Sequence, residues 1–303
     1  MTAAHATRCV ACRSVSWPGD TFCEECGHHI PADEAGARHD LELGSRAVGA
    51  ASDLGRRHAR NEDAFATAVA PDGRVLAVVC DGVSTTATPE RASRAAADAA
   101  VAAFLAAPDQ ESRVALEASY LAARCAVRQV PWMPEEEWAG APSCTFLAAV
   151  VNGRDVCVGS MGDSRAFWLP EVGEPRQLTE DDSWAQEQVQ AGAMTAEDAH
   201  ADPHGHAITR WLGRDAAPEW MPRVVSGDHA SRGRLVLCTD GLWHYAKSAA
   251  DLALVMPEGD PASAALHLVE WANAQGGQDN VTVVVIDVGT ADADRTEQKG
   301  PER

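Results

Sequence analysis

The stretch VLAVVCDG at residues 75–82 is an apolar run that ends in an Asp-Gly pair, and RLVLCTDG at residues 234–241 repeats this arrangement. Short apolar runs that are rich in Val and bounded by turn-forming residues are typical of buried strands. Asp-Gly is also common in the turns of β-hairpins, but neither pair is followed directly by a matching strand. Glycine beside aspartate lets the backbone approach a cation closely. Both pairs are therefore candidate functional positions at strand ends.

The spacing of apolar residues predicts further strands and helices. We expect additional strands at 64–70, 144–151, 156–160, 166–169 and 281–287. Helices are expected at 89–107, 111–130 and 261–274, where strong helix formers combine with apolar residues three or four positions apart. Two strands, two helices and then more strands do not alternate as a doubly wound sheet requires. This order predicts an α+β sandwich in which antiparallel sheets are covered by helices.

Two more acidic segments lie beside predicted strands. Asn61-Glu62-Asp63 precedes the strand at 64–70, and GGQDN at 276–280 precedes the strand at 281–287. Four carboxylates therefore fall at strand ends, where sheet edges can bring them together: Asp63, Asp81, Asp240 and Asp279. Such a group repels itself strongly unless a cation neutralises it. Ligands that are all oxygen favour magnesium or manganese over zinc, so the pattern predicts a shared divalent-cation site.

The N-terminal segment carries four of the nine cysteines as two Cys-x-x-Cys pairs, CVAC at 9–12 and CEEC at 23–26. Four thiolates at this spacing can enclose a zinc ion, so Cys9, Cys12, Cys23 and Cys26 are the candidate zinc ligands of a zinc ribbon. The alternative is a pair of redox dithiols. About 30 residues hold too little core to fold alone, and the metal would supply the folding free energy. We expect a structural or protein-docking role for this segment.

The amino-acid composition, and the net charge above all, excludes some classes of binding partner for this protein. The 303 residues contain 25 Lys and Arg against 45 Asp and Glu, a formal net charge of −20. Nucleic acid and anionic membranes are polyanions, so general affinity for either is not expected. We find no apolar stretch of membrane-spanning length and no secretory signal pattern. Five cysteines are scattered singly in the rest of the chain, as in proteins of a reducing compartment, which predicts a cytoplasmic location.

Four regions follow from composition and patterning. We expect a zinc ribbon at 1–30, a linker at 31–45, one large patterned domain at 46–287 and a disordered tail at 288–303. The linker and tail are polar or rich in Pro, Gly and Ala, with little periodicity.

Seven blocks of the patterned domain resemble the bacterial type 2C protein phosphatases, which are metal-dependent serine/threonine phosphatases. The blocks occur in the family's order. They are SDLGRRHARNED (52–63), AVVCDG (77–82), SCTFLAAV (143–150), VGSMGDSRAF (158–167), residues 178–213, RLVLCTDGL (234–242) and GGQDNVTVVVID (276–287). The resemblance implies a four-layer αββα sandwich, with two antiparallel sheets flanked by helices and a two-metal centre at one end. Residues 180–212 match the family's variable flap beside the active site.

The resemblance also implies roles for single residues. Asp81 bridges the two divalent cations, manganese or magnesium, and Asp240 and Asp279 complete one of them. The other is held by the Gly82 carbonyl, with Asp63 and Glu62 reaching it directly or through water. Asp163, in the Gly-Asp-Ser-Arg block, matches the position linked to a third, weaker metal.

The implied reaction is hydrolysis of phosphoserine and phosphothreonine in proteins by a water held between the two cations, opposing a serine/threonine kinase of the same cell. No Ser or Cys nucleophile is then needed. The alternative is a catalytically weak, phosphatase-like scaffold that binds phosphoproteins and is docked through its zinc ribbon. A third class, a nucleic-acid-binding protein led by the ribbon, conflicts with the net charge of −20.

Two departures from the family pattern motivate the scaffold alternative. The family usually carries an Arg five residues before Asp63 that contacts substrate phosphate, whereas this chain has His58 there, with Arg57 beside it. Either residue is a candidate phosphate ligand, and the alternative is that His58 only packs in its loop. After Asp81-Gly82 the family usually continues Met-Gly-Gly-His, but residues 83–86 read Val-Ser-Thr-Thr. Two histidines of the flap block, His204 and His206, are expected on the surface.

Overall fold

The computed structural model describes residues 47–132, 140–228 and 231–289, together with the backbone of three short N-terminal strands. These strands are β1 (Thr7–Arg8), β2 (Val15–Ser16) and β3 (His39–Glu42). The four cysteines predicted to bind zinc, and the tail from residue 290, lie outside the described residues. None of the helices in the described ranges is both long enough and apolar enough to cross a membrane.

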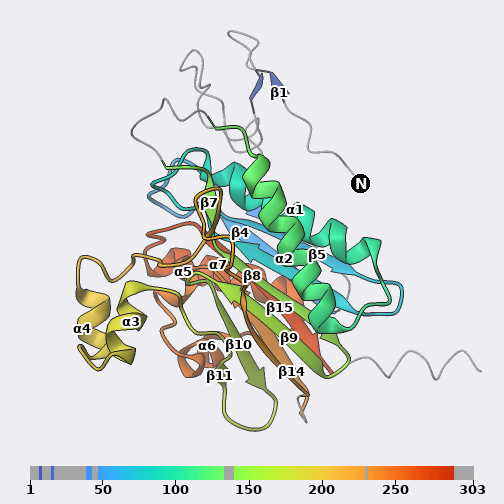
Figure 1. Cartoon of the computed structure of the whole chain (residues 1–303). Coiled ribbons are helices and arrows are strands. Elements are labelled where there is room, and N and C mark those ends of the chain that lie inside the picture. The colour runs from blue at the N-terminus through green and yellow to red at the C-terminus, as the bar shows by residue number, and fades with distance from the viewer. Residues whose placement is uncertain are drawn as a thin grey trace, which may run out of the picture.

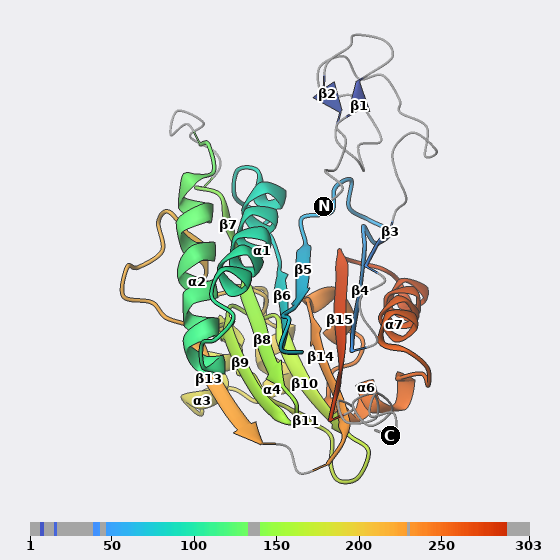
Figure 2. The same cartoon turned by 90° about the vertical axis from the view of Figure 1, so that its right-hand side faces the viewer.

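Two antiparallel sheets form the centre of the molecule (Figures 1 and 2). The six-stranded sheet has the order β11-β10-β14-β15-β4-β3, and the five-stranded sheet has the order β13-β9-β8-β6-β5. Their further strands are β4 (Val48–Asp53), β5 (Ala64–Val69), β6 (Val75–Cys80), β8 (Phe146–Asn152), β9 (Asp155–Met161), β10 (Arg165–Pro170), β11 (Arg176–Gln177), β13 (Arg223–Asp228), β14 (Gly233–Cys238) and β15 (Val281–Val288). A separate two-stranded ladder joins β7 (Ser143–Cys144) to β12 (Leu212–Gly213).

Helices cover the outer face of each sheet, as Figure 2 shows edge-on. The five-stranded sheet is covered by α1 (Pro89–Ala106) and α2 (Ser112–Gln129). The six-stranded sheet is covered by α5 (Asp240–Trp243), α6 (Ala249–Val255) and α7 (Pro261–Gln275). Two short helices, α3 (Trp184–Gln190) and α4 (Ala196–Ala201), project to one side in the block that we matched to the flap. The predicted α+β sandwich of two antiparallel sheets flanked by helices is confirmed.

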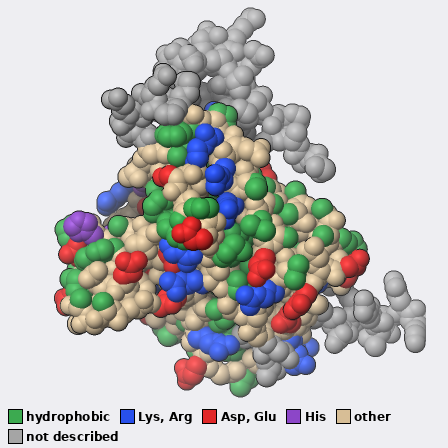
Figure 3. Space-filling model, viewed as in Figure 1, with side chains coloured by type: hydrophobic (Ala, Val, Ile, Leu, Met, Phe, Trp, Pro, Cys, Tyr) green, Lys and Arg blue, Asp and Glu red, His purple; other side chains and the backbone are tan. Residues whose placement is uncertain are grey.

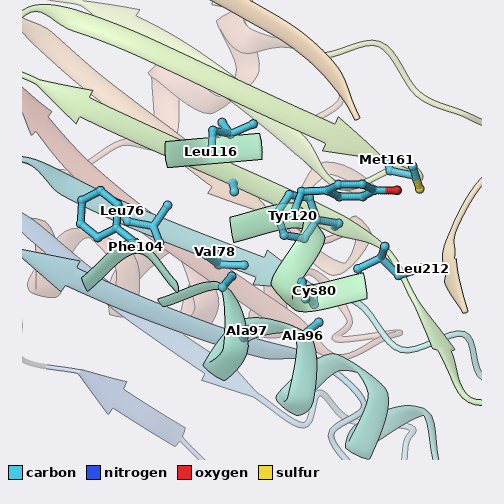
Figure 4. Packing of buried hydrophobic residues seen from close by; sticks show 14 of the residues in the cluster. Leu76, Val78, Cys80, Ala96, Ala97, Phe104, Leu116, Tyr120, Met161 and Leu212 are labelled. Carbon is cyan, nitrogen blue, oxygen red and sulfur yellow. The ribbon is translucent and has the colours of Figure 1, made fainter. Parts of the chain in front are cut away.

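Strand β6 explains why the central strands are continuous apolar runs. Successive side chains of a strand point to opposite faces, and here both faces are buried. Val75, Ala77 and Val79 face the second sheet, whereas Leu76, Val78 and Cys80 face α1 and α2 (Figure 4). The strand therefore passes through the sandwich without a solvent-facing position and ends at Asp81.

The predicted strands and helices are all present, with ends that shift by one or two residues, although the run at 144–151 divides at Thr145 into β7 and β8. Strand β4 was missed because VGAASD combines small residues with weak strand preference. Gly49 is required there, since a Cβ would lie 2.2 Å from the backbone nitrogen of Ala262 at the start of α7. Residues 39–42, inside the range expected as linker, form β3 and pair with β4. The sandwich therefore begins before residue 46.

Candidate active site

Four predicted carboxylates lie together where the central strands meet. Asp63 precedes β5, Asp81 follows β6, Asp240 begins α5 after β14, and Asp279 precedes β15. The charges of these groups act on one another: the pKa of Asp81 is raised well above its usual range by burial first, and then by Asp63, Asp240, Asp163 and Asp279. The antiparallel arrangement of the strands brings together residues that are up to 216 positions apart in the sequence (279 − 63).

The clustered carboxylates are destabilised by burial and by their mutual repulsion, and a positive charge would stabilise them. Burial, with repulsion from Asp163, Asp279 and Asp63, raises the pKa of Asp240 well above its usual range. Burial also raises the pKa of Asp63 to about 7, and the pKa of Asp163 to about 7 with Asp181 adding to the effect. In addition, Asp63 Oδ1 is a buried acceptor without a hydrogen-bond partner. A divalent cation would relieve both the repulsion and the unsatisfied oxygen.

The set of donors fits some metals better than others. Within the described ranges, no three His, Cys, Asp or Glu side chains are arranged tightly enough to hold a metal ion by themselves. The carboxylates are near enough to shift one another's pKa, and all of them offer oxygen ligands. Magnesium and manganese accept oxygen ligands and magnesium usually keeps several waters, whereas structural zinc is normally enclosed by four protein ligands. The arrangement therefore fits hard cations that are partly coordinated by water.

Asp63 is held from behind by buried hydroxyl groups that the sequence analysis missed. Thr239 Oγ1 donates to Asp63 Oδ2 at 2.8 Å, and the same hydroxyl accepts the Thr282 N–H at 3.0 Å. Ser52 and Thr282 are partners in the β4–β15 register, with their hydroxyl oxygens 2.7 Å apart. Asn61 Nδ2 donates to Ser52 Oγ at 2.8 Å. The only signal in the sequence was the presence of hydroxyl residues in otherwise apolar strands.

The Asp81-Gly82 backbone is clamped on two sides. The Asp81 N–H donates to Thr145 Oγ1 at 2.9 Å, and the Thr145 N–H donates to the Asp81 carbonyl at 2.8 Å. The Gly82 N–H donates to the Glu62 carbonyl at 3.1 Å. A Cβ at Gly82 would lie 2.7 Å from that carbonyl oxygen and 2.8 Å from Pro89 Cβ. Glycine is therefore required at position 82 by the close approach of the 61–63 segment and the start of α1.

Asn280 joins the two loops that carry the other carboxylates. Its Oδ1 accepts the Glu62 N–H at 2.7 Å, and its Nδ2 donates to the carbonyls of Leu54 and Arg60 at 2.8 and 2.9 Å. The neighbouring Asp279 Oδ1 accepts the Asn280 N–H at 2.8 Å. One buried amide thus sets the position of the 54–62 loop relative to Asp279.

We predict that Asn280→Ala lowers the free energy of unfolding by about 2 kcal/mol, because three partners lose hydrogen bonds in a partly buried place. The mutation is also expected to weaken manganese binding, because the 54–62 loop is no longer held against Asp279. Urea unfolding and titration calorimetry would measure the two effects. The exposed Asn152→Ala, in the β8–β9 hairpin, is the matched control. Unchanged stability and manganese affinity in Asn280→Ala would contradict this role.

Comparison with known proteins identifies the family of this chain. A family model described as protein phosphatase 2C matches residues 54–273. The chain belongs to the protein phosphatase 2C family. The serine/threonine protein phosphatase PstP of Mycobacterium tuberculosis is 34% identical over 250 residues, which covers 82% of this chain and 46% of that relative. The chain thus spans about half the length of the curated relatives it matches.

Solved structures of family members share the fold. The phosphatase MsPP of Mycobacterium smegmatis, crystallised in complex with cacodylate, superposes with a TM-score of 0.67 at 33% identity, covering 80% of this chain and 98% of that one. The catalytic domain of PstP, crystallised with two manganese ions, has a TM-score of 0.65 at 30% identity, covering 80% and 97%.

The first departure from the family pattern lies at the edge of the carboxylate group. His58 Nε2 lies 3.2 Å from Asp279 Oδ1, and the two side chains are 34% and 45% exposed. His58 therefore contacts a predicted metal ligand of this protein phosphatase 2C chain while part of its ring faces solvent. Arg57, the other candidate phosphate ligand, is exposed.

The second departure, the loop at 83–86, is connected to the same site. Ser84 Oγ donates to Glu62 Oε2 at 2.5 Å, and the Thr86 Oγ1 donates to the Val83 carbonyl at 2.7 Å. Burial raises the pKa of Glu62, and the bond from Ser84 partly offsets that rise. The hydroxyl groups of this loop thus hold its own turn and the Glu62 carboxyl.

Asp163 lies near the first residues of the segment that we matched to the flap of protein phosphatase 2C, because the charge of Asp181 acts on it. The Asp163 carbonyl accepts the Trp243 Nε1–H at 2.9 Å. The Arg165 guanidinium lies 3.7 Å from the centroid of the Trp243 ring and makes a buried, two-pronged ion pair with Asp181. These contacts fix the Asp163 backbone beside Asp240 and anchor the first residues of the flap.

The flap histidines lie on the surface. His204 and His206 are exposed, as expected. The His204 ring packs against Trp184, with the ring centroids 5.6 Å apart.

Proposed function

We propose that this chain hydrolyses phosphoserine and phosphothreonine in proteins, using two divalent cations, manganese or magnesium. The observation that carries the proposal is the group of mutually repelling carboxylates at the ends of β5, β6, β14 and β15. Membership of the protein phosphatase 2C family supports it, as do the two manganese ions in the PstP catalytic domain.

The residues present define which groups would hold the cations. Asp81 would bridge both, Asp240 and Asp279 would complete one, and the Gly82 carbonyl with Asp63 and Glu62 would serve the other. Asp163 would hold a third, weaker ion. Bound cations supply positive charge that polarises phosphate oxygens and lowers the pKa of water.

The chain's own groups orient the ligands and the substrate. Thr239, which also accepts the Thr282 N–H, fixes the Asp63 carboxyl by a hydrogen bond, and Asn280 fixes the backbone at Glu62. His58, whose Nε2 lies 3.2 Å from Asp279 Oδ1, would donate a hydrogen bond to a phosphate oxygen, and Arg57 is the second candidate for this contact.

Neighbouring thiols do not compete as nucleophiles. Burial raises the pKa of Cys144 and of Cys238 far above neutral pH, so both stay protonated and inert.

The test is phosphate release from a phosphothreonine peptide by the full chain, with and without manganese. Manganese-dependent release that is lost in Asp81→Ala supports the proposal. Tight binding of the peptide without release would favour the second candidate, a phosphoprotein-binding scaffold. The observation that favours this candidate is the loop at 83–86, whose sequence departs from the family pattern.

We propose that the enzyme acts in the cytoplasm, where it would oppose a serine/threonine kinase. Cys80, Cys144, Cys157 and Cys238 are buried free thiols, as that location allows.

We further propose that residues 1–30 form a zinc ribbon closed by Cys9, Cys12, Cys23 and Cys26. Elemental analysis of the full chain is expected to find one zinc per molecule after dialysis against manganese-free buffer. The double variant Cys12→Ser/Cys26→Ser should lose this zinc, because two thiolates of the tetrahedral set are removed. The control is Cys125→Ser, at an exposed cysteine of α2, which should keep it. Zinc retention in the double variant would contradict the assignment.

A further inference from the structure

A surface rich in Arg and Trp lies on the outer side of α2 and the segment after β12. Its members come from two parts of the chain that pack together, and we call it the Arg–Trp surface. They are Arg124, Arg128, Trp211, Arg214, Trp220 and Met221. Figure 3 shows a column of Lys and Arg side chains with hydrophobic side chains beside it over the upper part of α2.

The arginines of this surface are fixed in place without losing their charge. Arg124 Nη1 donates to the Pro218 carbonyl at 2.8 Å, and Arg214 Nη2 donates to the Arg128 carbonyl at 2.7 Å. A backbone carbonyl is neutral, so these bonds orient the guanidinium groups without neutralising their positive charge. By contrast, Arg113 at the start of the same helix is paired with Glu117 at 3.0 Å.

No carboxylate lies within ion-pair distance of Arg124, Arg128 or Arg214 in the part of the chain that the structure describes. Two acidic residues, Asp215 and Glu219, occur in the same segment, and Asp215 Oδ1 accepts the Trp211 Nε1–H at 3.0 Å. Three arginines against these two carboxylates give the described part of the surface a net charge of +1 (3 − 2), on a protein whose net charge is −20.

The aromatic residues add a preformed apolar contact. The rings of Trp211 and Trp220 meet edge to face at 5.4 Å, and the Tyr120 hydroxyl donates to the Trp220 carbonyl at 2.6 Å. Met221 beside them is 40% exposed. Trp and Arg are enriched among the residues that dominate binding energy at interfaces. This composition indicates a surface that binds a peptide.

The Arg–Trp surface adjoins the candidate active site. Strand β12 pairs Leu212 with Cys144, and Cys144 forms a bridge with Gly82, directly after Asp81. Arg214 follows β12 immediately. An extended peptide advances about 3.3 Å per residue, so residues that flank a phosphorylated side chain can reach this surface.

We propose that the Arg–Trp surface binds an acidic segment that flanks the phosphorylated residue of the substrate, an inference that rests on the proposed phosphatase function. The partner is acidic because the surface offers guanidinium groups that backbone carbonyls orient without neutralising them. The rest of the protein is strongly negative and repels such a peptide. A preference for acidic flanks therefore requires a local group of arginines that offsets this repulsion.

The experiment compares two phosphothreonine peptides, one flanked by glutamates and one by glutamines, with the full chain and manganese. We expect kcat/KM to be about tenfold higher for the acidic peptide at low salt and the difference to shrink at high salt, because exposed charges are screened. In Arg124→Gln/Arg128→Gln/Arg214→Gln the preference should disappear through a rise in KM. Hydrolysis of para-nitrophenyl phosphate, which is too small to reach the surface, should stay within about twofold. Arg113→Gln is the control and should keep the preference.

Equal kcat/KM for the two peptides in the wild type, or a preference that survives in the triple variant, would overturn the proposal. A separate measurement does not depend on turnover: fluorescence anisotropy of the unphosphorylated glutamate peptide with the full chain. If phosphate release fails while this binding is still lost in the triple variant, only the phosphatase function falls. Binding of a single-stranded oligonucleotide that is tighter than that of the peptide would show that the ligand class is wrong.

Discussion

Asp81→Asn is expected to reduce manganese-dependent phosphate release about a thousandfold, because the loss of a bridging carboxylate removes several kcal/mol of cation-dependent stabilisation of the transition state. The same change is expected to make the metal-free protein more stable. Asparagine keeps the shape of the side chain and removes the charge that Asp63, Asp240, Asp163 and Asp279 repel. A gain of about 1–2 kcal/mol corresponds to a rise in melting temperature of about 3–6 °C.

Differential scanning calorimetry with and without manganese measures both parts of this prediction. The wild type should be stabilised by manganese, whereas Asp81→Asn should start higher and respond little. Asp109→Asn, at an exposed position between α1 and α2, is the control and should behave as the wild type. A metal-free Asp81→Asn protein that melts below the wild type would show that the carboxylates do not repel one another as the geometry indicates. Full activity in that variant would remove Asp81 from the reaction.

The second large effect is a loss of stability in the metal-free protein as the pH rises from 5.5 to 8. In the folded state the pKa of Asp63 and that of Asp163 are about 7, against 3.8 for an ordinary aspartate. Between these values the folded protein holds protons that the unfolded chain releases. Stability therefore decreases with rising pH until the folded groups have also ionised. The expected loss is about 2 kcal/mol or more, which is about 4–8 °C in melting temperature.

Saturating manganese should remove this dependence of stability on pH. Manganese binds the ionised carboxylates, so its stabilising effect increases as these groups lose their protons. Thermal melts at both pH values, with and without manganese, provide the measurement. The double variant Asp63→Asn/Asp163→Asn is expected to flatten the pH dependence in the absence of metal. Stability that rises between pH 5.5 and 8 in the metal-free wild type would contradict the pKa shifts of both carboxyls.

Local patterns in the sequence were sufficient for most of the regular elements. Strand β6 was predicted with its observed ends, because a strand buried on both faces is a continuous apolar run. Helices α1 and α7 begin at Pro89 and Pro261, where proline suits the first turn. Strand β4 was missed because it consists mostly of small residues. At Gly49 a small residue is needed because α7 packs closely against the strand, and this is a contact between segments far apart in the sequence.

By itself the sequence determined which chemistry is present: carboxylates at strand ends, an Asp-Gly pair after each of two buried strands, and the family resemblance that assigned roles to them. Only the tertiary structure decided how these groups are held. Asn280 reaches across to Leu54 and Arg60, Thr239 and Thr282 support Asp63, and Ser84 holds Glu62. The physical reason is that hydrogen bonds depend on distance in space, and antiparallel pairing places residues side by side whose separation in the chain no local pattern can encode.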